Sequence, residues 1–102
     1  MMYKLQYLPL ALKDLREITD YITDTHKAPE AAMDFLDALH DSISMLQKFP
    51  YSYKIYQSIQ PLENEYRLLP AKNYVVFYIV KEEVVEIHRV VYGKMDLTKF
   101  IK

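Results

Sequence analysis

Residues 74–80 read Tyr-Val-Val-Phe-Tyr-Ile-Val, an unbroken run of β-branched and aromatic residues. These residue types are enriched in strands, so the run predicts a strand of a sheet. On its C-terminal side, the charged turn 81–83 leads to a second β-prone segment at 84–92. On its N-terminal side, residues 66–69 predict another strand and residues 70–73 a turn. Consecutive strands joined by short turns pair antiparallel, so these three strands are expected to form a meander.

Two amphipathic helices are predicted upstream of the meander. Pro9 and Pro29 each suit the first turn of a helix, where the missing N–H costs nothing. Apolar residues at helical spacing follow each proline: Ala11, Leu15, Ile18 and Ile22, then Ala32, Phe35, Leu36, Leu39, Ile43 and Leu46. We expect the first helix to run to about Asp24 and Pro50 to end the second. Because only a short connection separates them, the helices should pack as an antiparallel hairpin.

The order of the elements defines the fold class. Residues 4–8 alternate well enough for a short N-terminal strand, which gives the order β-α-α-β-β-β. The helices precede the meander instead of alternating with its strands, so the class is α+β. We predict one domain over residues 1–102, with the helix hairpin packed on one face of a small antiparallel sheet. The tyrosine-rich segment 51–64 is expected to be a loop, with a short strand around 54–56.

Composition excludes several classes of protein. The chain has no cysteine, so it has neither a disulfide framework nor a thiolate metal site. It also lacks paired histidines at the spacing of metal ligands. We expect neither a metal nor a cofactor. No apolar run approaches the length of a membrane span, and residues 1–12 lack the pattern of a secretory signal, so we expect a cytoplasmic protein with no membrane partner.

Charge is distributed unevenly along the chain. Residues 1–50 carry five basic and eight acidic side chains, whereas residues 51–102 carry eight basic and six acidic ones. Any contact with a polyanion is therefore expected in the C-terminal half. The net charge of −1 does not suggest a strongly basic nucleic-acid binder.

Both faces of the strand at 74–80 are apolar or aromatic. Under strict alternation Tyr74, Val76 and Tyr78 point to one face, and Val75 and Phe77 to the other. A helix hairpin covers only one face of a sheet, so we expect an exposed apolar patch on the other face, which is typical of an interaction site. Homodimerisation through the same face is the alternative interpretation.

The order of elements and its landmarks resemble a known family. The matching residues are Tyr7-Leu8-Pro9-Leu10-Ala11, Asp14-Leu15, Ile18, Tyr21-Ile22, Pro29, Ala32, Phe35, Leu39, Ile43, Leu46, Phe49-Pro50, Tyr66-Arg67, Tyr74-Val75-Val76-Phe77-Tyr78 and Ile87-His88-Arg89-Val90-Val91-Tyr92-Gly93-Lys94-Met95-Asp96. They occur in the expected order and spacing over nearly the whole chain. On these residues the chain resembles the RelE/ParE superfamily of bacterial toxin–antitoxin toxins.

The resemblance implies a growth-inhibiting toxin that a small antitoxin protein neutralises by wrapping around it. We assign the antitoxin-binding surface to Tyr74, Val76 and Tyr78, and expect the free toxin to be a monomer or a homodimer. The family has two main branches: RelE-like members cleave messenger RNA on the ribosome, and ParE-like members poison DNA gyrase. A third possibility is a degenerate, non-toxic member that only binds its antitoxin.

The nuclease branch needs a base, an acid and cations around the scissile phosphate. Candidate cations are Lys54, Arg67, Arg89 and Lys94; Glu63 or Glu65 is the candidate base, and His88 or Tyr92 the candidate acid. Met95 stands where RelE-like nucleases carry a second arginine, which argues against this branch. Two of these candidates also have structural explanations. Arg67 can form a salt bridge, and Arg89 can be turned outward by a β-bulge or pair with a carboxylate.

The gyrase branch needs no catalytic set. The segment Tyr92-Gly93-Lys94-Met95-Asp96 resembles the ParE-like block, in which a methionine–aspartate pair follows the last strand. We therefore predict a gyrase poison whose target contacts are Tyr92, Lys94, Met95 and Asp96, with the nuclease built on Lys54, Arg67, His88 and Arg89 as the alternative.

Overall fold

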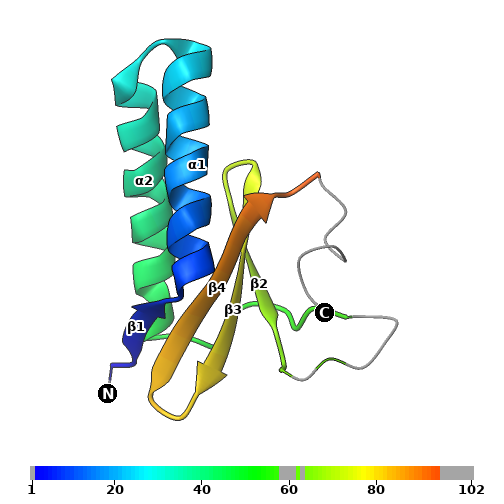
Figure 1. The fold of residues 1–102 in the computed structure, drawn as a ribbon. Helices are drawn as coiled ribbons and strands as arrows, with labels where there is room; N and C mark the ends of the chain where they lie inside the picture. The colour runs from blue at the N-terminus through cyan, green and yellow to red at the C-terminus, as the bar shows by residue number, and fades with distance from the viewer. Residues whose placement is uncertain (1, 58–61, 63, 95–102) are drawn as a thin grey trace.

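The computed structural model describes residues 2–57, 62 and 64–94 of the chain (Figure 1). Its elements are β1 (Lys4–Tyr7), α1 (Pro9–His26), α2 (Pro29–Ser44), the short 3₁₀ helix η1 (Met45–Gln47), β2 (Arg67–Ala71), β3 (Tyr74–Lys81) and β4 (Val84–Tyr92). The predicted order β-α-α-β-β-β and the α+β class are confirmed. No helix within this described part is long and apolar enough to cross a membrane.

The two helices form the predicted hairpin beside the sheet (Figure 1). Proline occupies the first turn of each helix, as expected. Helix α1 ends at His26, because the following residue, Lys27, adopts a left-handed φ of 50° that stops the helical hydrogen-bond pattern. The second helix ends earlier than predicted, because the chain tightens into η1 at Met45, five residues before Pro50.

The sheet has the strand order β1-β4-β3-β2. The pairs β2–β3 and β3–β4 are antiparallel, so the predicted meander is confirmed. The prediction of an antiparallel sheet is wrong for β1, which lies parallel to β4. Parallel neighbours need a long crossover connection, and the helix hairpin together with β2 and β3 supplies one.

The main core lies between the helix hairpin and one face of the sheet. It contains Ala11, Ile18, Phe35, Leu39, Ile43, Leu46, Leu69, Ala71, Val76, Tyr78, Val85, Ile87 and Val90. Two residues of the predicted antitoxin surface, Val76 and Tyr78, are therefore fully buried under the helices. Their assignment is corrected: alternation groups the side chains of β3 correctly, but it does not tell which group the hairpin covers.

The second face of the sheet is covered by the segment that follows η1. Phe77 and Val91 are buried there, with Tyr56, Leu62, Tyr66 and Leu68 packed against them. Residues 54–56 pair with the outer edge of β2, since Ile55 forms a β-bridge with Arg67. The short strand predicted around 54–56 is thus present only as a single bridge residue. The expectation of an exposed apolar face at Phe77 is wrong, because this loop folds back over it.

Pro70 belongs to β2, although the sequence predicts a turn there. The strand is the last one in the sheet order, and proline is tolerated on an edge strand because it needs no partner for an N–H. The turn is the shorter pair Lys72-Asn73, in which Lys72 adopts a φ of 57°.

A β-bulge interrupts the pairing of β3 with β4. Phe77 pairs with Arg89 and Tyr78 pairs with Ile87, so His88 is the extra residue on β4. The bulge reverses the alternation, which is why Val90 joins the main core where strict alternation predicts Val91. The expected bulge near Arg89 is thus confirmed.

Candidate functional site

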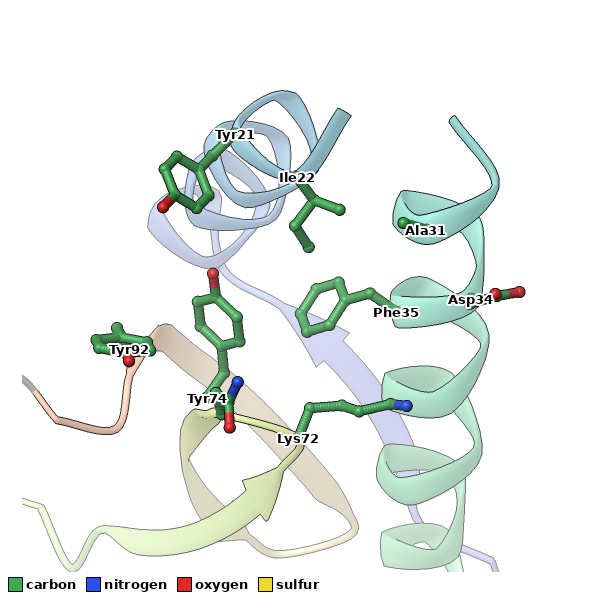
Figure 2. Close-up of a pocket in the computed structure, with 9 residues that line it drawn as sticks. Tyr21, Ile22, Ala31, Asp34, Phe35, Lys72, Tyr74 and Tyr92 are labelled. Atoms are coloured by element: carbon green, nitrogen blue, oxygen red, sulfur yellow. The ribbon is translucent and has the colours of Figure 1, made fainter. Parts of the chain in front are cut away.

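A tyrosine-lined groove runs between the helix hairpin and the end of the meander (Figure 2). It consists of two hollows of about 620 Å³ and about 270 Å³. Tyr21 of α1, Tyr74 of β3 and Tyr92 of β4 line both hollows. The groove therefore joins residues from three elements that are distant in the sequence.

The larger hollow is mainly apolar. Figure 2 shows Ile22 and Phe35 reaching from the two helices toward Tyr74. The ring of Tyr74 lies 5.1 Å from that of Phe35 and 5.7 Å from that of Tyr92, between ring centres. These are ordinary spacings for packed aromatic pairs, so the floor of the hollow is a continuous aromatic surface.

The tyrosines of the groove differ in exposure. Tyr21 is 62% exposed and Tyr92 is 39% exposed, whereas Tyr74 is half-buried between them. Burial, followed by the neighbouring Tyr21 and Tyr92, raises the pKa of Tyr74. Each of the three rings carries a hydroxyl that can donate and accept hydrogen bonds, so the groove presents apolar rings with polar tips.

The smaller hollow is built on an ion pair between α1 and β4. Arg89 donates from Nε to Asp14 Oδ2 and from Nη2 to Asp14 Oδ1, both at 2.8 Å. The backbone N–H of Val90 also donates to Asp14 Oδ2, at 3.0 Å. The hydrogen bonds that Arg89 donates to Asp14 raise the pKa of the guanidinium, burial lowers it, and the negative charges of Asp14 and Glu17 raise it further, so that the net shift is upward.

Asp14 takes over the edge of β4 where β1 ends. The pairing of β1 with β4 stops at Tyr7 and Ile87, and the chain enters α1 two residues later. The carboxylate of Asp14 then accepts the N–H of Val90, as a strand neighbour would. The carboxylate partner expected for Arg89 is thus confirmed. Asp14 itself was not predicted as a site residue, although a charge within the stripe of Ala11 and Ile18 is a signal of a buried pair.

Arg67 lies at the start of β2, at the other end of the sheet. Its Nη1 donates to the carbonyl of Tyr53 at 2.7 Å, and its Nη2 lies 3.4 Å from Glu65 Oε1. Its guanidinium carbon is 5.0 Å from the ring centre of Tyr51, a cation–π distance. With its side chain only 14% exposed, Arg67 holds the loop onto the sheet. The salt bridge expected as its structural explanation is confirmed.

His88 lies on the face of the sheet that the loop covers. Its Nδ1 is 3.3 Å from the hydroxyl of Tyr66, and its Nε2 is 3.2 Å from Glu86 Oε1. The rings of His88 and Tyr66 meet edge to face, with 5.1 Å between their centres. The imidazole is thus held from both nitrogens.

The structure does not bring the predicted nuclease residues together. Arg67 pairs in register with Tyr78, which faces the helices, whereas His88 contacts Tyr66 on the opposite face. Arg89 reaches Asp14 on α1. Lys54 is exposed on the loop, where its carbonyl accepts the N–H of Leu68. The candidate base Glu63 lies outside the described residues.

The groove contains part of each predicted binding set. Of the antitoxin set only Tyr74 lines it, and of the target-contact set only Tyr92 does. Lys94 is exposed just beyond β4, and Met95 and Asp96 lie outside the described residues. Sequence reasoning missed the roles of Tyr21 and Phe35, because nothing in a helical stripe shows which of its residues border an opening.

The fold and the site together define the chain as a small α+β protein with an open aromatic groove. The sequence profile of the family described as "ParE toxin of type II toxin-antitoxin system, parDE" matches residues 5–97. The chain belongs to this family of toxins. No curated protein sequence shows significant similarity to it.

Two solved structures show the same fold. One is described as "Chromosomal ParDE TA system from P. aeruginosa", with a TM-score of 0.74, 21% sequence identity, and coverage of 91% of this chain and 98% of that chain. The other is the "E. coli DinJ-YafQ toxin-antitoxin complex", with a TM-score of 0.58, 13% identity, and coverage of 90% of this chain and 93% of that chain.

Proposed function

We propose that this chain is a toxin that poisons DNA gyrase and that its antitoxin docks in the groove of Tyr21, Tyr74 and Tyr92. We choose gyrase over messenger RNA as the target because Arg67, His88 and Arg89 lie apart in the fold. Metal-free RNA cleavage needs its acid, base and cations around one phosphate, and these residues do not surround a common point.

The groove has the character of a protein-binding surface. Tyrosine supplies a large contact area at a low cost in side-chain entropy, and it is enriched at the energetic centres of interfaces. Ile22 and Phe35 add apolar surface to the part of the groove that the tyrosine rings line. A partner segment laid across this floor would bury an apolar surface that water otherwise contacts.

The RelE-like nuclease is a second candidate because of the environment of His88. Tyr66 and Glu86 hold its two ring nitrogens, which is an arrangement that can pass a proton along a chain of groups. In a nuclease of this design, His88 would act as the acid, and a cation close to it would be Lys81, whose Nζ lies 3.9 Å from the same Glu86 Oε1.

A gyrase assay tests the proposed target. The purified toxin is incubated with gyrase, ATP and plasmid DNA, and the reaction is stopped with detergent and protease. We expect inhibition of supercoiling together with cleaved DNA, both reversed by the antitoxin. Arg67→Met should behave like the wild type in this assay. Intact gyrase activity with cleavage of ribosome-bound messenger RNA would overturn the assignment in favour of the nuclease.

Two exposed tyrosines allow a matched test of the groove. Tyr21 lines the groove and is 62% exposed, whereas Tyr51 lies outside it and is 58% exposed. Tyr21→Ala should weaken the binding of the cognate antitoxin by about tenfold or more, the usual effect of truncating an interface tyrosine. Tyr51→Ala should leave binding within about twofold of the wild type. Equal effects would place the interface elsewhere.

A further inference from the structure

The charged side chains that the helices contribute to the groove are acidic. Asp14 and Glu17 line the smaller hollow and Asp34 lines the larger one, and Asp14 is paired with Arg89. Glu17 is part of the helical wall of the smaller hollow, near enough to Arg89 to contribute to the rise of the arginine pKa. Lys13 Nζ lies 3.9 Å from Glu17 Oε1, but both side chains are about two-thirds exposed. Such a surface ion pair contributes little to stability.

Lys72 gives the sheet wall of the larger hollow a positive charge. It belongs to the turn between β2 and β3 and lines the hollow together with Asn73. Figure 2 shows its side chain extended toward α2, while the carboxylate of Asp34 points away from the hollow. The cation therefore stands at one end of the groove and Glu17 at the other, with the three tyrosines between them.

We propose that the antitoxin segment in this groove has an apolar spine flanked by two opposite charges, a basic side chain facing Glu17 and an acidic side chain facing Lys72. This inference rests on the docking of the antitoxin in the groove proposed above. Complementary charges at the border of an apolar contact contribute mainly to specificity and register. They would fix the direction in which the segment runs and exclude antitoxins with the reversed pattern.

Charge reversals at the two ends test the proposal. The affinities of the wild type, Glu17→Lys and Lys72→Glu for the cognate antitoxin are measured at about 50 mM and about 500 mM salt, where screening differs strongly. Each reversal should weaken binding by about threefold to tenfold at low salt, and the difference should shrink at high salt. Restoring the affinity of each variant with the opposite charge in the antitoxin identifies the partner side chain.

Matched controls separate a local contact from a change in total charge. Asp41→Lys makes the same charge change as Glu17→Lys on the same hairpin, and Lys48→Glu matches Lys72→Glu. Neither control residue lines either hollow. Both controls should stay within about twofold of the wild type.

The outcomes distinguish this inference from the proposed function. If Tyr21→Ala loses binding while Glu17→Lys and Lys72→Glu do not, the charge pattern is wrong and the docking site stands. If the reversals and their controls weaken binding equally, the effect is long-range and the pattern is again wrong. If the wild-type chain does not bind the antitoxin, both proposals fall.

Discussion

Arg89 and Arg67 both extend from strands of the sheet, but they are bound by different kinds of partner. Arg89 makes two charge-assisted hydrogen bonds to Asp14, and the two side chains are only 22% and 9% exposed. Arg67 donates its shortest bond to a neutral backbone carbonyl, and its ionic partner Glu65 is 63% exposed. A buried charge that loses its partner is costly, whereas an exposed pair is worth little.

The comparison assigns a structural role to each arginine. Arg89 joins β4 to α1 through Asp14, whose carboxylate also accepts the Val90 N–H at the edge of the sheet. Arg67 holds the loop that covers the second face, through Tyr53 and Tyr51. The difference between the two environments predicts the order in which substitutions destabilise the protein.

Removing the carboxylate of Asp14 should have the largest effect. Asp14→Ala leaves the Arg89 guanidinium and the Val90 N–H without their acceptor, so the free energy of unfolding should fall by about 2–4 kcal/mol. Urea unfolding followed by circular dichroism measures the loss. Asp14→Asn keeps an acceptor for Val90 and should lose less. A loss below about 1 kcal/mol for the alanine variant would show that the pair is not needed.

Alkaline pH should destabilise the protein through Tyr78, close to Arg67. Burial raises the pKa of Tyr78 to about 12, although Arg67 acts in the opposite direction. The unfolded tyrosine ionises near pH 10, so its contribution to stability is complete below pH 10 and is lost as the pH rises to 12.

The size of this pH effect should be about 2 kcal/mol between pH 10 and pH 12. It is measured as the difference between the wild type and Tyr78→Phe, in urea unfolding across that range. The phenylalanine variant also loses the hydrogen bond from the tyrosine hydroxyl to Pro50, so it should be less stable by about 1 kcal/mol at pH 7. If the free energy of unfolding fell equally with pH in the two proteins, the alkaline loss of stability would not come from Tyr78.

Replacing Arg67 should have a smaller effect than replacing Asp14. Arg67→Met keeps the apolar stem and removes the bond to Tyr53 and the contact with the Tyr51 ring, which should cost about 1–2 kcal/mol. The pKa of Tyr78 should rise further, because the nearby cation lowers it. Urea unfolding and ultraviolet titration of the tyrosines measure the two effects. A cost equal to that of Asp14→Ala would remove the distinction between the arginines.

Neutralising Glu65 should have the smallest effect. Glu65→Gln removes an ion pair at 3.4 Å whose carboxylate is mostly in water, so stability should change by less than about 0.5 kcal/mol. The change should vanish at high salt. A loss larger than that of Arg67→Met would mean that Glu65, and not the Tyr53 carbonyl, holds the arginine.

Most of the fold follows from local patterns in the sequence. The apolar spacing after Pro9 and Pro29 and the β-prone run at 74–80 are sufficient to predict both helices and the meander. The bulge at His88 could not be placed, because every residue around it is compatible with a regular strand. The loop over Phe77 was also unpredictable, since a segment without a period gives no sign of which face it covers.

The site was predictable only in part. Tyr74 and Tyr92 were predicted as contact residues, and both line the groove. Val76 and Tyr78 were assigned to the same surface, but the choice of the face under the hairpin depends on tertiary packing that alternation does not contain. The dispersal of Arg67 and His88 has the same origin, because sequence spacing does not reveal on which side of the sheet each residue lies.

A pulse-labelling experiment tests the central claim most directly. The chain is expressed in a bacterial host, as the wild type and as Arg67→Met, and the incorporation of labelled thymidine and labelled leucine is followed over the first minutes. Our account predicts that thymidine incorporation falls first in both cases and that cells become filamentous. A first fall in leucine incorporation, abolished by Arg67→Met, would contradict it and identify a translation-directed nuclease.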